Sequence, residues 1–357
     1  MPDILRNTFE RGERPEQVDE TAHERLRPGE DLLDRPLGAL YGAVSGDWTG
    51  APTRFLSRAR IGRLLLPSAA SGALHDGGLS EALTTPNVDL GRIVADLLIE
   101  GDGRIDEGAL RSALQEWLRA DGRDAGHIDP AIAAALCDLD GAGAPTVTGW
   151  HGDSNGCLPG AIVVGVATTP APVADLIDRV EEMCRPTHDT GLAIAGASAV
   201  AAAISAGIEG AALVRALEAG EQAAALGAGR GRFVPGASVA ERIDWALELV
   251  AASGTERSLA LVSELVGTGV RVQETVPAAF ALALLWPDDP WRVCLEAARL
   301  GGDTSSVGAS AAAIVGSVTG LRAFPPEAAP FLSGVNRQRL RDVAQDLVRL
   351  RLHEAEA

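Results

Sequence analysis

A short segment near the C-terminal end combines two glycines, an aspartate and three hydroxyl side chains. It reads Gly301-Gly302-Asp303-Thr304-Ser305-Ser306, and small residues follow as far as Gly320. The glycines predict a tight turn, and the small-residue run predicts a helix that can pack closely against a neighbour. The free N–H groups and positive dipole at the start of that helix would then face a pocket. This pattern is typical of a site that presents oxygen ligands to a metal or an anion.

The elements that would position this segment are all predicted to be helices. The chain is rich in Ala, Leu, Arg and Glu, aromatic residues make up 4%, and no convincing run alternates with the period of a strand. Gly and Pro separate the expected helices, which cover residues 37–46, 90–100, 105–120, 131–139, 161–168, 172–184, 191–206, 208–218, 239–253, 256–266, 275–285, 289–299, 305–318 and 337–352.

No long polar linker interrupts this helical series. We therefore expect one compact all-α multi-helix bundle over residues 34–357. Residues 1–33 are highly charged and poor in apolar side chains, and they predict a flexible or loosely docked arm.

Charge and cysteine usage restrict the partners. The formal net charge is −18, which argues against nucleic acid and anionic membranes, because both require a clustered basic surface. The four cysteines, Cys137, Cys157, Cys184 and Cys294, show no C-x-x-C spacing and predict reduced thiols. We expect a cytoplasmic protein whose partner is a small molecule.

Four motifs in order give the chain a resemblance to the ADP-ribosylglycohydrolase family. Residues 37–52 look like its opening G-x-x-x-G-D-x-x-G-x-P-x-E, and residues 155–160 are similar to its N-G-x-x-x-R loop. Thr187-His188-Asp189 resembles its T-H motif, and Glu274-Thr275-Val276-Pro277 followed by Gly301-Gly302-Asp303-Thr304 resembles its last segment. The matching order covers roughly residues 36–350. The resemblance implies an all-helical fold that hydrolyses ribosyl bonds with a pair of magnesium ions.

The departures from the family motifs fall on the magnesium ligands. The family's T-D-D-T is replaced here by Thr85-Pro86-Asn87-Val88, and Ser305 and Ser306 replace an aspartate and a threonine of its final motif. Arg54 stands where the opening motif ends in glutamate. Paired divalent cations need several carboxylates to offset their repulsion, and a guanidinium stays charged. We therefore expect no binuclear magnesium centre and no other cofactor.

The motifs supply a set of candidate site residues. Asp303 and Asp47 are candidate catalytic carboxylates, and His151 with Asp153 form a further acid/base cluster. The candidate ligand-binding residues are Arg54, Thr85, Asn87, Asn155, His188, Ser305 and Ser306. No residue is assigned to a metal.

Several of these residues also have purely structural interpretations. Arg54 could pair with Asp303 or Asp47 in the space the metals left, or it could bind a phosphate or carboxylate of a ligand. Asp303 could simply cap the helix that follows it. His188 could be a histidine associated with a helix end.

Two functions remain open from the sequence. The first is hydrolysis of a ribosyl N-glycosidic bond, in a small nucleotide or nucleotide-derived metabolite, without a binuclear magnesium centre. The alternative is a non-catalytic binding or structural protein, as in the J-class lens crystallins of the same fold family. We favour the enzyme because Asn87, Ser305 and Ser306 keep the site polar. The oligomeric state stays open.

Overall fold

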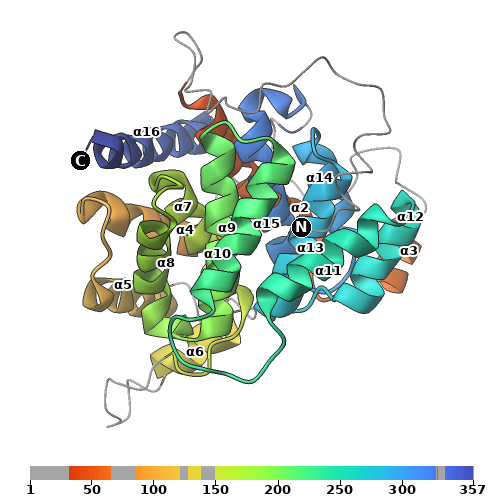
Figure 1. The fold of residues 1–357 in the computed structure, drawn as a ribbon, viewed down its shortest axis with the longest axis horizontal. Helices are drawn as coiled ribbons and strands as arrows, with labels where there is room; N and C mark the ends of the chain where they lie inside the picture. The colour runs from red at the N-terminus through yellow and green to blue at the C-terminus, as the bar shows by residue number, and fades with distance from the viewer. Residues whose placement is uncertain are drawn as a thin grey trace.

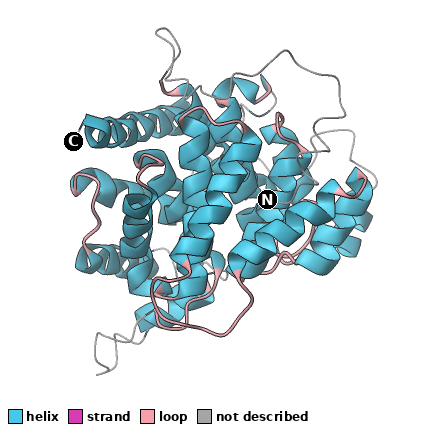
Figure 2. Cartoon of the chain, viewed as in Figure 1, coloured by secondary structure: helices cyan, strands magenta, loops and turns pink. Residues whose placement is uncertain are grey.

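The chain folds into helices joined by loops (Figure 2). The computed structural model describes residues 32–65, 85–120, 128–137, 149–326, 328 and 334–356. Within these ranges the only β pairing consists of two isolated bridges, Ser154–Arg271 and Thr190–Arg232. The all-α fold expected from the sequence is confirmed. Residues 1–31 of the expected N-terminal arm lie outside the described residues.

Figure 1 shows the arrangement of these helices around a central layer. In chain order the elements are α2 (Asp34–Gly50), η1 (Ala51–Thr53), α3 (Arg58–Leu65), α4 (Pro86–Glu100), α5 (Glu107–Ala120), α6 (Pro130–Cys137), η4 (Asn155–Cys157), α7 (Leu158–Ala167), α8 (Val173–His188), α9 (Gly191–Ile208), α10 (Leu213–Gly227), α11 (Val239–Ala251), α12 (Thr255–Leu261), η5 (Val262–Val266), α13 (Val272–Leu285), α14 (Pro290–Ala297), α15 (Thr304–Thr319), η6 (Leu321–Ala323) and α16 (Gly334–Glu356).

Most expected helices are present with shifted ends. α7 begins at Leu158 rather than at residue 161, because Pro159 sits in its first turn, where the missing N–H of proline leaves no hydrogen bond unmade. The helix expected over residues 256–266 consists of α12 and one π-helical turn, η5. The sequence pattern predicts no helix at α3, which is short and rich in arginine.

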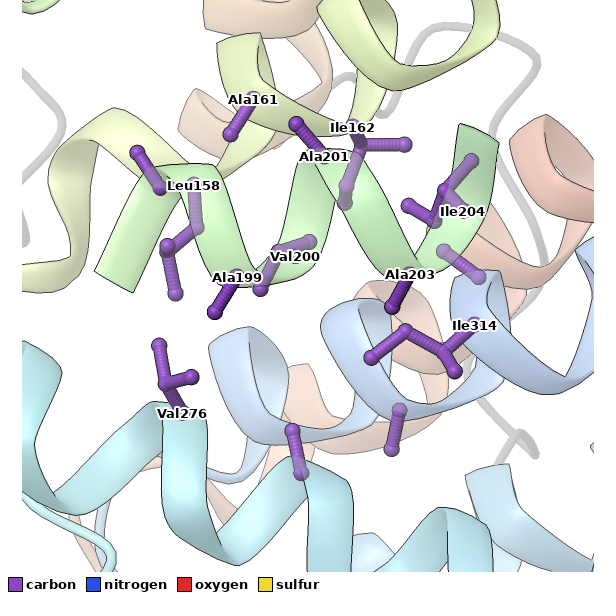
Figure 3. Packing of buried hydrophobic residues seen from close by; sticks show 14 of the residues in the cluster. Leu158, Ala161, Ile162, Ala199, Val200, Ala201, Ala203, Ile204, Val276 and Ile314 are labelled. Atoms are coloured by element: carbon purple, nitrogen blue, oxygen red, sulfur yellow. The ribbon is translucent and has the colours of Figure 1, made fainter. Parts of the chain in front are cut away.

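The centre of the bundle is α9. Every residue of α9 is buried, and α7, α8, α10, α13 and α15 pack around it. In Figure 3, Ala203 of α9 lies beside Ile314 of α15, and Ala161 and Ile162 of α7 lie on the opposite side of α9. By length and composition α9 could cross a bilayer, but it is wholly buried inside the protein, as in the core of a globular fold.

α2 and α15 pack with backbone against backbone. α2 carries a glycine once per turn, at residues 38, 42, 46 and 50. A Cβ added at Gly42 would lie 2.3 Å from the carbonyl oxygen of Ala312, and one added at Gly46 would lie 2.2 Å from that of Gly308. Only a residue without a side chain fits at such distances. We call these four residues of α2 the glycine row.

The glycine row sets the direction of the pair as well as its spacing. Gly38 faces Gly316 near the end of α15, and Gly50 faces Ser305 at its start. The two helices therefore run antiparallel. The last turn of α2, which holds Asp47, consequently meets the first turn of α15, which follows Asp303.

The C-terminal helix α16 is fixed by a buried arginine. Arg351 is 6% exposed, and its Nη1 donates to the carbonyl oxygen of Thr168 over 2.5 Å. Its Nη2 donates to the carbonyl oxygen of Ser205 over 3.0 Å and to Oε2 of Glu209 over 2.7 Å. Thr168 follows the end of α7 and Ser205 lies in the last turn of α9, so one guanidinium satisfies carbonyls at two helix C-termini.

Candidate functional site

The turn before α15 is built around its two glycines. Gly301 and Gly302 have φ values of 83° and 75°, and a Cβ on Gly302 would lie 2.3 Å from the carbonyl oxygen of Thr268. Thr268 fixes the turn from outside, because its carbonyl accepts from the Asp303 N–H over 2.6 Å and its hydroxyl donates to the Gly301 carbonyl over 2.7 Å. Asp303 is thereby delivered to the start of the helix.

The Asp303 side chain does not cap α15. It makes no capping hydrogen bond to the helix backbone and is fully buried. Nε of Arg54 donates to its Oδ1 over 2.8 Å. Its Oδ2 accepts from Nδ2 of Asn155 over 2.8 Å and from Oγ of Ser306 over 2.9 Å. The ion pair with Arg54 that the sequence suggests is present, and the capping interpretation is wrong.

The second carboxyl group, that of Asp47, lies in the last turn of α2. Its Oδ1 accepts from Nδ2 of Asn87 over 2.8 Å, and its Oδ2 accepts from the Thr85 hydroxyl. Burial raises the pKa of Asp47, and although the bonds from Thr85 and Asn87 and the charge of Arg54 act in the opposite direction, they do not cancel it. This carboxyl is thus biased towards its neutral form.

The start of α4 brings both partners to Asp47. Thr85 caps α4, since its hydroxyl oxygen accepts from the Val88 N–H over 3.2 Å, and Pro86 follows at the first helical position. This capped turn projects Asn87 towards α15. The segment that replaces the family's T-D-D-T therefore lies against Asp47, as the alignment of motifs requires.

Ser306 and Asn87 together link the Asp303 and Asp47 carboxylates into one hydrogen-bonded cluster. Nδ2 of Asn87 lies 3.5 Å from Oγ of Ser306, which in turn donates to Asp303. We call this set the carboxylate cluster; it consists of Asp47, Arg54, Thr85, Asn87, Asn155, Asp303 and Ser306. Ser305 lies beside it but donates to the Asp47 backbone carbonyl over 3.1 Å and is 2% exposed.

His188 lies in a second layer behind Asn155. It is fully buried, with Nε2 at 3.0 Å from Oγ of Ser154 and 3.5 Å from Oδ1 of Asp129, and Nδ1 at 2.8 Å from Oγ1 of Thr187. Burial disfavours the charged form of both groups, yet their contact lowers the pKa of Asp129 and, with a contribution from Cys157, raises the pKa of His188. These bonds hold the loop that carries Asn155.

The sequence reasoning missed three residues of this support. Asp129 accepts from Ser154 over 2.9 Å and caps α6 through the backbone N–H of Ile132. Thr275 accepts from Nδ2 of Asn155 over 2.8 Å. An aspartate directly before a proline at a helix start is a capping signal that could have identified Asp129. Ser154 and Thr275 carry no comparable signal.

The other acid/base candidates are not part of the carboxylate cluster. Asp153 forms an ion pair with Arg271, and its backbone carbonyl accepts from the Val272 N–H over 3.1 Å. His151 is exposed on the same loop. Their assignment as catalytic residues stays a prediction.

The donor set of the cluster does not fit a pair of magnesium ions. In the described part of the chain, no group of three or more His, Cys, Asp or Glu side chains is placed to hold a metal. Protein donors already bind both carboxylates, and one of the donors to Asp303 is the Arg54 guanidinium. Two divalent ions would meet a fixed positive charge and too few carboxylates.

A separate cavity of about 180 Å³ lies between α8, α16 and the turn after α4. Its charged residues Arg179 and Glu354 form an ion pair with each other. None of the sequence candidates lines it. The carboxylate cluster, and not this cavity, is therefore the candidate functional site.

Comparison with known proteins agrees with the geometry. A family profile described as ADP-ribosylglycohydrolase matches residues 28–356. The chain belongs to the ADP-ribosylglycohydrolase family. It is 32% identical over 328 residues to the uncharacterized protein YegU of Escherichia coli (strain K12), covering 89% of this chain and 97% of that one.

A solved structure described as an ADP-ribosylglycohydrolase-related protein complex has the same fold. The TM-score is 0.63 with 22% identity, over 90% of this chain and 99% of that one. Membership of the ADP-ribosylglycohydrolase family supports a glycohydrolase-like function for this chain.

Proposed function

We propose that the protein hydrolyses a ribosyl N-glycosidic bond in a small nucleotide or nucleotide-derived metabolite, and does so without a binuclear magnesium centre. The observation that carries this proposal is the carboxylate cluster. It brings two buried carboxyl groups, those of Asp47 and Asp303, into one hydrogen-bonded cluster, with the Arg54 guanidinium bound to Asp303. The ligand is a small molecule, and we expect the protein to act in the cytoplasm.

The reaction adds water across the bond between C1′ and the leaving nitrogen. C1′ takes the hydroxyl group, and the nitrogen takes a proton. Positive charge develops on the ribose as the C1′–N bond breaks, and a buried carboxylate placed beside it stabilises that charge strongly because little water screens it. We assign this electrostatic role to Asp303.

Asp47 has the environment of a proton donor. Its raised pKa leaves a larger fraction of the carboxyl protonated near neutral pH than an exposed aspartate would have. Asp303 is instead paired with the Arg54 guanidinium, so the acid role and the electrostatic role can be divided between the two carboxyl groups. We assign protonation of the leaving nitrogen to Asp47, with Thr85 and Asn87 orienting it.

Arg54 decides how a ligand reaches Asp303. Its side chain is 15% exposed, whereas that of Asp303 is fully buried beneath it. An incoming phosphate would meet the guanidinium first and bind it bidentately. When Arg54 turns to the phosphate, one oxygen of Asp303 becomes available to the ribose. Substrates without a phosphate should therefore react more slowly.

The test is release of free ribose phosphate from a panel of ribosyl compounds by the full chain. Nicotinamide and purine nucleotides are compared with their nucleosides, with and without EDTA, and the products are separated by chromatography. Asp303→Asn should abolish turnover. Asp96→Asn, which changes a surface ion pair with Arg92, should leave it unchanged. Absence of turnover on every compound would favour the non-catalytic alternative, and loss of turnover in EDTA would overturn the metal-free assignment.

A further inference from the structure

Phe55, the residue after Arg54, has an unusual backbone conformation. Its φ is 61°, in the left-handed region that a bulky aromatic residue rarely adopts. Asp102 is the other non-glycine residue with positive φ in the described ranges, but aspartate tolerates this region far better than phenylalanine does. The conformation of Phe55 therefore carries strain that needs a reason.

The surrounding backbone enforces this strain. The Phe55 N–H donates to the Gly302 carbonyl over 2.7 Å, and the Gly302 N–H donates to the Leu56 carbonyl over 3.0 Å. The turn that delivers Asp303 thus also fixes the residue after Arg54. Strain of this kind persists where the structure over-determines it, and it concentrates at ligand-binding positions.

Burial does not supply the reason for the strain. Phe55 is 49% exposed, so half of the residue's surface contributes nothing to the core. Its ring instead lies next to the carboxylate cluster, with Cζ of Arg54 4.7 Å from the ring centroid. A flat apolar face is thereby held beside the one partly exposed cation of the cluster.

We propose that Phe55 is a specificity-determining residue that stacks on the aromatic ring of the ligand, a nucleobase or pyridine ring, while Arg54 binds the ligand's phosphate. The inference rests on the proposed function, because it names the part of a nucleotide that this site recognises. Stacking on an aromatic side chain is tolerant of ring type and adds to phosphate binding. Arg54 and Phe55, adjacent in sequence, would contact the two ends of a mononucleotide.

The test uses two probes that differ only in the base, AMP and ribose 5-phosphate. Their dissociation constants are measured by calorimetry for the full chain and for two variants. Phe55→Leu keeps an apolar side chain without the aromatic face, and Phe55→Gly removes the strain as well. Both variants should bind AMP about 5- to 150-fold more weakly than the parent does. Their dissociation constants for ribose 5-phosphate should stay within about twofold of the parent value. Phe55→Gly should also melt no lower than the parent, because glycine adopts positive φ without cost.

Phe233→Leu is the matched control, because Phe233 is 89% exposed on a loop without any candidate site residue; it should bind both probes like the parent. Equal weakening of both probes by Phe55→Leu would show that the ring supports the Arg54–Asp303 pair rather than the base. Unchanged binding of AMP would also overturn the inference while leaving the proposed function standing. A parent protein that binds neither probe would overturn both.

Discussion

Arg54 donates from Nε to Oδ1 of Asp303 over 2.8 Å and partly covers a carboxylate that has no exposure of its own. The two residues are far apart in sequence and are brought together by the antiparallel packing of α2 on α15. Four predictions follow from this pair and its surroundings.

Removing Arg54 should destabilise the fold. Arg54→Ala leaves the buried Asp303 carboxylate without its countercharge, which costs on the order of 3–5 kcal/mol of unfolding free energy. Chemical denaturation of the parent and the variant measures this loss. Arg92→Ala, which removes a partner of an exposed ion pair, should change the stability by less than about 1 kcal/mol. Equal losses in the two variants would contradict the prediction.

The pH dependence of the unfolding free energy should reveal the titration of the Asp47 carboxyl group. Its pKa is higher in the folded protein than in the unfolded chain, so between the two values the folded state binds more protons and stability falls as pH rises. Asp47→Asn removes this titration. The stability of the variant relative to the parent should therefore increase as pH rises above about 4, and then level off.

Urea denaturation across this acidic range measures the effect, with Asp96→Asn as a control that should follow the parent. A constant difference between Asp47→Asn and the parent at all pH values would mean that the Asp47 pKa is not raised. If Asp47 protonates the leaving group, turnover should also decline as pH rises through the same pKa.

Magnesium should not bind the carboxylate cluster tightly. Calorimetric titration at millimolar concentrations should show no two-site binding, and EDTA should leave the melting temperature unchanged. Arg54→Glu, which introduces the family's residue, should not create a magnesium site by itself, because Asn87, Ser305 and Ser306 still replace the other ligands. Two-site binding by the parent protein would refute the electrostatic argument.

The glycine row should tolerate no side chain. Gly42→Ala places a Cβ 2.3 Å from a backbone oxygen of α15, and the helices must separate to admit it. We expect a loss of at least about 2–3 kcal/mol. Gly62→Ala is the matched control, because its Cβ meets nothing within 4 Å on exposed α3; it should be neutral or gain up to about 1 kcal/mol. Similar melting of both variants would refute the close contact.

The sequence predicted the site best where a single motif specified both the backbone turn and the side chain that the turn positions. Gly301-Gly302-Asp303 predicted a tight turn followed by a helix start, and both are present. The sequence also suggested that Arg54 could pair with Asp303 or Asp47, and in the structure it pairs with Asp303. His151 and Asp153 were selected for their residue types and for their place next to Asn155 in the chain, and the structure does not bring them into the carboxylate cluster.

The interactions that the sequence did not reveal are those made by single residues over long distances. Arg351 binds carbonyl oxygens at the ends of α7 and α9, which lie far earlier in the chain. No local sequence pattern predicts a contact of this kind. The roles of Ser154 and Thr275 likewise depend on which loops meet, because a lone hydroxyl side chain has no preferred partner. Some helices begin or end at residues other than the predicted ones, and the causes are local. An example is α7, which begins at Leu158 because Pro159 fits in its first turn.

The close contact of α2 with α15 also decides which parts of the site can move when a ligand binds. Two backbones already in contact cannot approach further, and sliding them apart would open a gap that no side chain is long enough to fill. The separation of the Asp47 and Asp303 backbones is therefore a constant of the scaffold. Adjustment to different ligands is therefore left to side chains such as that of Arg54. Substitution of side chains at this site could alter its chemistry without changing the spacing of the two helices.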